Sequence, residues 1–199
     1  MTAADNSLVI SAALFTTLID ELAHRGDGQR ESGAFLLASR APALGAVTSG
    51  RWQTVVAVAY YDDLDPACLT GGITFSANGY TALAAVCRRD GMRAVGDIHT
   101  HPGNLVGQSP IDAAYPMVAL PGHIALIAPS YARGPVEAAD LGAHVFNGAG
   151  QWTSRFGDDV TEVLRIGPPV LPAAVTVRRS PMRALSQRLR RLITPWKLR

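Results

Sequence analysis

The chain has 199 residues, of which 48% are hydrophobic and 17% charged, which suits one globular domain with an appendage. Its net charge of +2 combines a charge of −7 over residues 1–162 with a charge of +9 over residues 163–199. No apolar run approaches the length of about eighteen residues that a membrane-spanning helix needs, so we expect none.

The cellular compartment is predicted from the N-terminus and the cysteines. The first residues, MTAADNSLVI, lack the basic-then-apolar layout of a secretory signal. The two cysteines, Cys68 and Cys87, are too few and too far apart for a disulfide framework, so we expect both to be reduced. A cytoplasmic location is the expectation that follows, because thiols stay reduced there.

Turn residues and apolar spacing divide the first half of the chain into strands and helices. Ser11 is a typical N-cap for a helix whose leucines recur at helical spacing and which ends near Gly26. A second helix is stopped by Asp90-Gly91. The other expected elements are strands at 8–10, 33–39 and 52–61, a loop over 62–72, and the second helix over 77–89.

The second half is expected to alternate less regularly. Residues 143–156 predict a hairpin around Asn147-Gly148, a dipeptide favoured in tight turns. Strands and helices thus mix without strict alternation, which predicts an α/β sandwich around one mixed sheet flanked by helices. The further elements are strands at 93–99 and 123–130, a loop over 103–108, and a short helix that begins at Ser109.

The composition changes near Asp158, which predicts a domain over residues 1–157 and a proline-rich linker with a basic C-terminal helix over 158–199. All acidic residues precede this helix. We expect the tail to contact protein, either the acidic body or a partner, in preference to nucleic acid or a membrane. One side of the helix carries Met182, Leu185, Leu189 and Leu192.

Three metal-ligand residue types fall within one short segment, HTHPGNLVGQSPID. Side chains alternate across a strand, so His99 and His101 face the same way while Thr100 faces back. Asp112 follows eleven residues later and could reach the same point through a compact loop. Three ligands leave tetrahedral zinc one position for water, which indicates a catalytic site. Iron and manganese accept the same ligand types.

Parts of this segment also fit ordinary structural roles. The stretch Ser109-Pro110-Ile111-Asp112 is a typical helix start, with a serine cap, proline at the first position and an acid at the third. We expect His24, His123 and His144 to be structural. Asp97 could orient a ligand histidine from behind.

The segment resembles the JAMM motif, also called MPN+, of zinc-dependent isopeptidases: H-x-H, seven residues, then S-x-x-D. His99, His101, Ser109 and Asp112 fit it position by position. Glu31 in ESGAFLLAS looks like the family's upstream catalytic glutamate, which spacing alone does not single out. The resemblance spans residues 7–157 and is greatest to the prokaryotic JAB branch. It implies the MPN/JAB sandwich, which is similar to cytidine deaminase.

This resemblance implies one zinc ion (Zn²⁺) per chain, held by His99, His101 and Asp112. It also implies that Glu31 carries the proton from water to the leaving amine, while Ser109 donates to the oxyanion. The implied substrate is the bond after the C-terminal glycine of a ubiquitin-like protein, in precursor processing or deconjugation. The implied partners are ubiquitin-activating-like and conjugating enzymes, and an antiviral conjugation system is one setting that the resemblance implies.

Two other functions stay open at this point. One is release of an amino acid such as cysteine from a sulfur-carrier protein. The other is a catalytically silent MPN scaffold, which the intact ligands and Glu31 disfavour. The substrate of a metalloprotease and the metal content of the purified protein distinguish these alternatives.

Overall fold

The computed structural model describes residues 6–40 and 52–167 of the chain. Its strands are β1 (Ser7–Ser11), β2 (Gly33–Ser39), β3 (Trp52–Val55), β4 (Ala57–Tyr60), β5 (Met92–Thr100), β6 (Ile124–Ala128), β7 (Gly142–Gly148), β8 (Gln151–Phe156) and β9 (Leu164–Gly167). Its α-helices are α1 (Ala12–Gly26), α2 (Tyr61–Leu64), α3 (Ala77–Arg89) and α4 (Pro110–Ala114). Short 3-10 helices cover Ser130–Ala132, Ala138–Asp140 and Gly157–Glu162.

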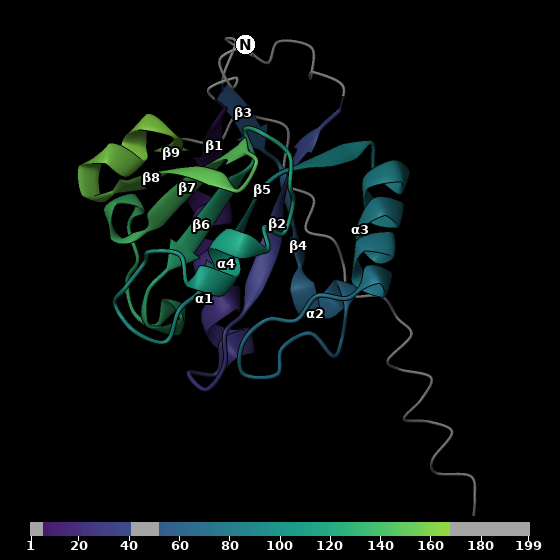
Figure 1. The fold of residues 1–199 in the computed structure, drawn as a ribbon, viewed down its shortest axis with the longest axis horizontal. Coiled ribbons are helices and arrows are strands. Elements are labelled where there is room, and N and C mark those ends of the chain that lie inside the picture. Colours follow the sequence, from purple (N-terminus) through teal and green to yellow (C-terminus); the bar gives the residue numbers. More distant parts are fainter. Residues whose placement is uncertain (1–5, 41–51, 168–199) are drawn as a thin grey trace, which may run out of the picture.

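The strands form two sheets flanked by helices, which is an α/β arrangement (Figure 1). The larger sheet has six strands in the order β4-β2-β5-β6-β7-β8 and is mixed, because only β5 and β6 run parallel. The second sheet is parallel, with the order β3-β1-β9. The expected α/β class is confirmed, whereas the single mixed sheet is a pair of sheets.

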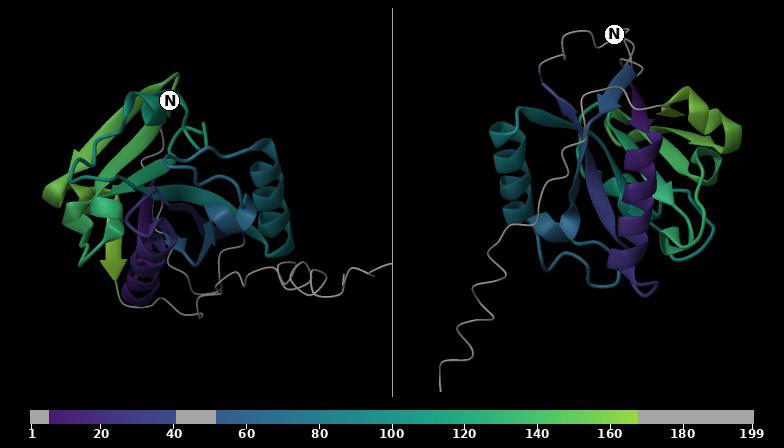
Figure 2. Two further views of the ribbon diagram at one scale, coloured as in Figure 1. Left: turned by 90° about the horizontal axis from the view of Figure 1, so that it is seen from below. Right: turned by 180° about the vertical axis from the view of Figure 1, so that it is seen from behind.

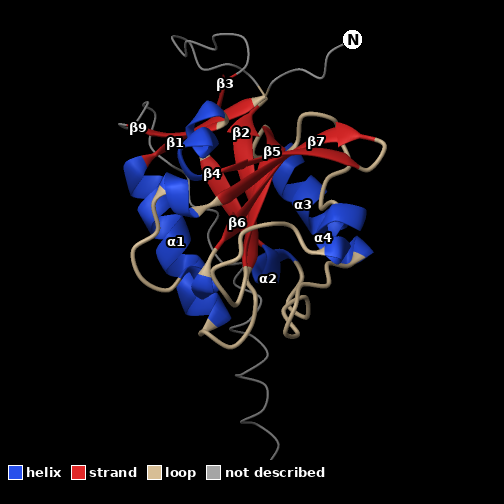
Figure 3. Cartoon of the chain, turned by 60° about the vertical axis from the view of Figure 1, so that its left-hand side comes forward, coloured by secondary structure: helices blue, strands red, loops and turns tan. Residues whose placement is uncertain are grey.

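Helices lie on both sides of the large sheet. The two long helices α1 and α3 take opposite faces, and the short helix α4 lies on the same side as α3 (Figure 3). Seen from behind, α1 runs across the face that α3 leaves free (Figure 2). Ser11 caps α1 by accepting a hydrogen bond from the Leu14 amide over 3.2 Å, as the sequence predicts.

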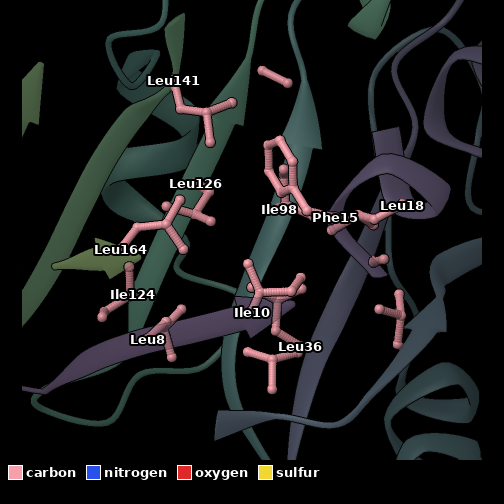
Figure 4. Packing of buried hydrophobic residues seen from close by; sticks show 14 of the residues in the cluster. Leu8, Ile10, Phe15, Leu18, Leu36, Ile98, Ile124, Leu126, Leu141 and Leu164 are labelled. Atoms are coloured by element: carbon pink, nitrogen blue, oxygen red, sulfur yellow. The ribbon is translucent and has the colours of Figure 1, made fainter. Parts of the chain in front are cut away.

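Each face of β2 supplies a different hydrophobic cluster, because successive side chains point to opposite sides. Leu36 packs with α1 and with residues of the small sheet (Figure 4). Phe35 and Leu37 pack with α3 and the segment after α2. The strand is therefore buried on both faces, as its unbroken apolar run requires.

The segment expected to be one strand over 52–61 divides at Val56. Its first part, β3, pairs with β1, and its second part, β4, pairs antiparallel with β2. Between them the Val56 amide donates to the Leu37 carbonyl over 2.8 Å. Tyr61, which was expected to end the strand, is instead the first residue of α2. The expected loop over 62–72 therefore starts with a short helix.

The predicted hairpin over 143–156 is present as β7 and β8, but its turn lies two residues later than Asn147-Gly148. Gly148 pairs with Gln151, which leaves Ala149 and Gly150 as the two turn residues. Both have positive φ, at 49° and 71°, the backbone region used by two-residue hairpin turns.

Residues 158–167 pack against the body. Val160 and Leu164 are at most 1% exposed and belong to the core cluster that contains α1. Strand β9 pairs with β1 from Leu8 onward. The packed body therefore reaches at least Gly167, beyond the boundary expected at residue 157. The expected C-terminal helix lies outside the described residues, so the tail stays a prediction.

Both cysteines are free and buried, as expected of reduced thiols. Burial raises the pKa of the Cys68 thiol to about 12, and burial also raises the pKa of Cys87. Neither thiol is therefore ionised at neutral pH. Among the described helices, none is long and apolar enough to cross a membrane.

A nearly buried arginine joins α1 to the start of α2. The Arg25 side chain, 6% exposed, donates to Glu21 and Asp63 over 3.1 Å each, and also to Asp62. Its guanidinium lies 3.9 Å from the centre of the Tyr60 ring. This cluster holds the end of α1 against the chain that leaves β4.

Replacing this arginine tests how much the cluster stabilises the fold. We expect Arg25→Met to lower the free energy of unfolding by about 2–4 kcal/mol, below the full cost of breaking a buried pair because its acids are partly exposed. Arg155→Met, which breaks the more exposed pair with Glu162, should cost less than about 1 kcal/mol. Urea unfolding measures both, and equal losses would contradict the assignment.

Candidate metal centre

The end of β5 delivers two histidines to one face of the large sheet. His99 and His101 lie two positions apart, so their rings face the same side while Thr100 faces the opposite one. Both imidazoles are mostly buried, with side chains 10% and 12% exposed. The predicted alternation is therefore confirmed at this strand end.

The nitrogen and oxygen atoms of three residues converge. The Nε2 atoms of His99 and His101 are 3.2 Å apart, and Asp112 Oδ2 lies 3.8 and 3.4 Å from them, respectively. Tetrahedral ligands held at about 2.0–2.1 Å from zinc lie about 3.3 Å from one another. The donor set and its spacing therefore fit a single metal ion, and these three residues could hold one.

The other ring nitrogen of His101 has a partner of its own. Its Nδ1 lies 2.9 Å from the Leu105 carbonyl oxygen, which can only accept, so the ring proton is on Nδ1. In the neutral ring Nε2 then carries a lone pair directed toward His99 and Asp112, and in the protonated ring it carries a proton that it can donate to Asp112. A metal-binding imidazole needs this tautomer, and a backbone carbonyl commonly fixes it.

Asp112 combines a structural role with its place among the ligands. The Ser109 amide donates to its Oδ2 over 2.7 Å, and the Asp112 amide donates to Ser109 Oγ over 3.2 Å. This reciprocal pair is a capping box with Pro110 at the first helical position. The helix start fixes where the carboxylate lies. The two interpretations of the Ser-Pro-Ile-Asp stretch, a helix start and a source of a metal ligand, are therefore compatible.

The loop that carries the ligands is anchored to the hairpin of β7 and β8. His144 contacts the Val106 carbonyl oxygen through Nε2 at 3.0 Å and Ser154 Oγ through Nδ1 at 2.8 Å. Trp152 donates from its indole nitrogen to the Ala113 carbonyl over 3.0 Å, which ties α4 to β8. The expected structural role of His144 is confirmed, and its place is beside the ligand loop.

Glu31 lies just before β2. The next residue, Ser32, is hydrogen-bonded to Thr100 of β5. The Ser32 amide donates to Thr100 Oγ1 over 3.0 Å, while the Thr100 amide donates to the Ser32 carbonyl over 2.9 Å. Both Ser32 and Thr100 are fully buried. On the other side of the segment, the Glu31 amide donates to the Gly71 carbonyl over 2.9 Å. The glutamate is thus held beside the two histidines.

The acids and bases of the site shift one another's pKa. Burial raises the pKa of the Glu31 carboxyl, although positive charge on His99 and His101 opposes the shift. Burial would also raise the pKa of Asp112, but hydrogen bonds from the two imidazoles outweigh it and hold that pKa well below its usual range. Hydrogen bonding to Asp112 raises the pKa of His101. Protons and a metal ion therefore compete for this imidazole.

All five residues predicted from the sequence line one pocket of about 1070 Å³. They are Glu31, His99, His101, Ser109 and Asp112. The lining also includes the aromatic and apolar side chains of Tyr61, Phe75, Tyr80 and Met117. The Tyr80 hydroxyl donates to the Met117 carbonyl over 2.9 Å and so links α3 to the chain after α4. The pocket therefore combines these five polar residues with a largely apolar lining.

Asp97 contacts other residues than the ligand histidine for which it was predicted. His123 Nε2 lies 2.6 Å from its Oδ1, and the Tyr61 hydroxyl donates to its Oδ2 over 3.1 Å. His123 is thus a satisfied core histidine, as expected, and His24 is exposed. Tyr61 had no sequence signal of its own, because its place in the pocket depends on the break after β4.

The comparisons with known proteins bear on the fold. A protein from Desulfitobacterium hafniense is 17% identical with a TM-score of 0.53, over 81% of this chain and 94% of the other. One from Salinibacter ruber is 18% identical with a TM-score of 0.50, over 83% and 94%. A JAB1/MPN domain protein from Archaeoglobus fulgidus is 16% identical with a TM-score of 0.39, over 76% and 96%.

No protein-family model matches the chain. At identities of 17% and 18%, the first two likenesses show a shared fold and nothing of the activity. The third, with a TM-score of 0.39, is too distant to carry weight. What the site does must therefore be inferred from its own residues.

Removing a ligand tests the metal centre directly. We expect His101→Ala or Asp112→Ala to weaken zinc binding by more than about 100-fold, since even residues that only orient ligands contribute about 10–100-fold. Elemental analysis after dialysis and a competition titration with a chromophoric chelator measure the loss. His24→Ala, a change at an exposed histidine, is the control. One zinc per chain in either ligand variant would contradict the site.

Proposed function

We propose that this chain is a zinc-dependent peptidase or isopeptidase of the JAMM/MPN+ type. The observation that carries the proposal is the convergence of His99, His101 and Asp112 in one pocket with Glu31 and Ser109. Three ligands in a cleft, with a carboxylate and a hydroxyl beside them, form the minimal set for metal-assisted hydrolysis. Both thiols are buried and hold their protons, so a cysteine nucleophile does not compete with this reading.

When bound, zinc supplies Lewis acidity that activates water and polarises the attacked carbonyl. Glu31 then serves as the proton carrier: its carboxylate accepts the proton of the attacking water and passes it to the leaving amine nitrogen. Its raised pKa suits this exchange, because a base that is slightly stronger than an ordinary glutamate takes up the proton more readily.

Ser109 is the donor for the oxygen that gains charge. Its Oγ already accepts the Asp112 amide, and a hydroxyl that accepts one hydrogen bond still has its own proton to donate. The same cap that positions Asp112 therefore directs a donor into the pocket. The oxyanion formed on the attacked carbonyl would receive this hydrogen bond.

The substrate we propose is the bond after the C-terminal glycine of a ubiquitin-like protein. The pocket, at about 1070 Å³, lies just above the range of about 300–1,000 Å³ for small-molecule sites and suits a stretch of polypeptide. Thr70 and residues 72–75 line it, and the Glu31 amide donates to the Gly71 carbonyl of the same segment. Activating and conjugating enzymes of a bacterial conjugation system would be the partners, with the basic tail as one contact for them.

Glu31→Gln tests the proton carrier. We expect the variant to bind one zinc per chain while its turnover falls by at least about 100-fold, because the amide cannot accept the proton of water. Cleavage of a ubiquitin-like protein fused through its C-terminal glycine to a short peptide measures the rate, with a chelator-treated sample as the zero. Near-normal turnover with zinc bound would exclude the role given to Glu31.

Ser109→Ala separates the oxyanion donor from the helix cap. Its kcat should fall by about 100–1,000-fold, which is the usual effect of removing one oxyanion donor. The matched control is Ser11→Ala, because Ser11 caps α1 with a hydrogen bond of the same 3.2 Å length and is not among the pocket-lining residues. The control should lose stability but keep kcat. If kcat is the same in both variants, Ser109 is only a helix cap and not an oxyanion donor.

A further inference from the structure

Three buried polar side chains meet at the pocket, and two of them, Tyr61 and Asp97, are part of its lining. Asp97, His123 and Tyr61 are 1%, 5% and 0% exposed, and they are joined by the two hydrogen bonds to the Asp97 carboxylate described above. A carboxylate oxygen only accepts, so both partners donate to it. Burial raises the pKa of the Tyr61 hydroxyl well above its ordinary value, which keeps that proton in place. The trio is thus a closed network.

The network joins elements that are not neighbours in sequence. Asp97 lies on β5, two positions before His99 and on the same face of the strand. His123 immediately precedes β6, whose Ile127 pairs with His99. Tyr61 begins α2 directly after β4, on the other side of β2 in the sheet order. One carboxylate therefore links both sides of the strand that ends in the histidines.

Tyr61 also reaches the segment that carries Glu31. Its ring occupies the space that a Cβ at position 33 would need, so only glycine fits there. Gly33 pairs with His99 across the sheet and lies two residues after Glu31. The ring is held in place by Phe35 and Phe75, with centroids 4.9 and 5.4 Å away. The hydroxyl of Tyr61 thus connects the start of β2 to Asp97.

We infer that Asp97, with His123 and Tyr61, is a positioning unit that sets the end of β5 and the start of β2 against each other. In this role it fixes the spacing between the ligand histidines and Glu31 without touching the substrate's reacting atoms. An apolar trio would fill the same volume, but it could not hold the register by directed hydrogen bonds. The inference rests on the proposed function, because it concerns the geometry of that same site.

The test uses the full-length chain and three variants. Tyr61→Phe removes one donor but keeps the ring against Gly33, and Asp97→Asn presents an amide where two donors converge. Arg155→Met is the control, because it breaks an ion pair outside the pocket lining. Each protein is loaded with Co²⁺ for its visible absorption spectrum, titrated with zinc against a chromophoric chelator, and assayed on the glycine-linked peptide fusion.

We expect Asp97→Asn to lower kcat by about 10–100-fold, the usual effect of losing a residue that supports a metal site from outside its ligands, with KM changed by less than about twofold. Tyr61→Phe should lower it less. Both should alter the Co²⁺ spectrum or weaken zinc binding, whereas Arg155→Met should change neither. The inference is overturned if both variants match the control in spectrum, zinc affinity and kcat.

The metal measurements separate this inference from the proposed function. If the unsubstituted chain binds one metal ion but cleaves no glycine-linked fusion, the proposed substrate is wrong. The Co²⁺ spectra of Asp97→Asn and Tyr61→Phe then still test whether the network positions the ligand histidines. If the unsubstituted chain binds no metal, both the proposed function and the positioning role are overturned.

Discussion

The antiparallel pairing of β2 with β5 is the constraint on which the site depends. It places Gly33 opposite His99, so that Glu31 is brought beside the histidines, although they are far apart in the sequence. The hydrogen bonds between Ser32 and Thr100 fix this pairing from within the core. A slip of one residue would turn both histidines to the opposite face. The register of two strands is therefore a condition for bringing Glu31 and the two histidines together.

Two residues of the site, Asp112 and Ser109, each have a structural role in a helix cap as well as a place in the pocket. Asp112 closes a capping box and presents the same Oδ2 to the imidazoles. Ser109 caps α4 and retains a proton for the pocket. Helix α4 has five residues, too few to be stable alone, and is held by the box and by Trp152. The position of Asp112 on so short a helix therefore depends on the capping box and on the hydrogen bond from Trp152.

Local patterns predicted much of this architecture, and long-range contacts account for what they missed. Alternation along a strand placed His99 and His101, and helix-start chemistry placed Asp112, because both rules act over a few residues. The change of sheet at Val56 and the partners of Asp97 depend on which strands become neighbours. Glu31 was identified by family resemblance, since its position relative to the histidines exists only after β2 and β5 pair.

The small sheet has a consequence for how the chain is made. Strand β1 lies between β3 and β9, so its two neighbours come from the middle and from the far end of the packed body. During synthesis the nascent chain therefore exposes an unpaired edge of β1 until Leu164 has left the ribosome. An expression fragment that stops at residue 157 would keep that edge open permanently and would be prone to self-association through it.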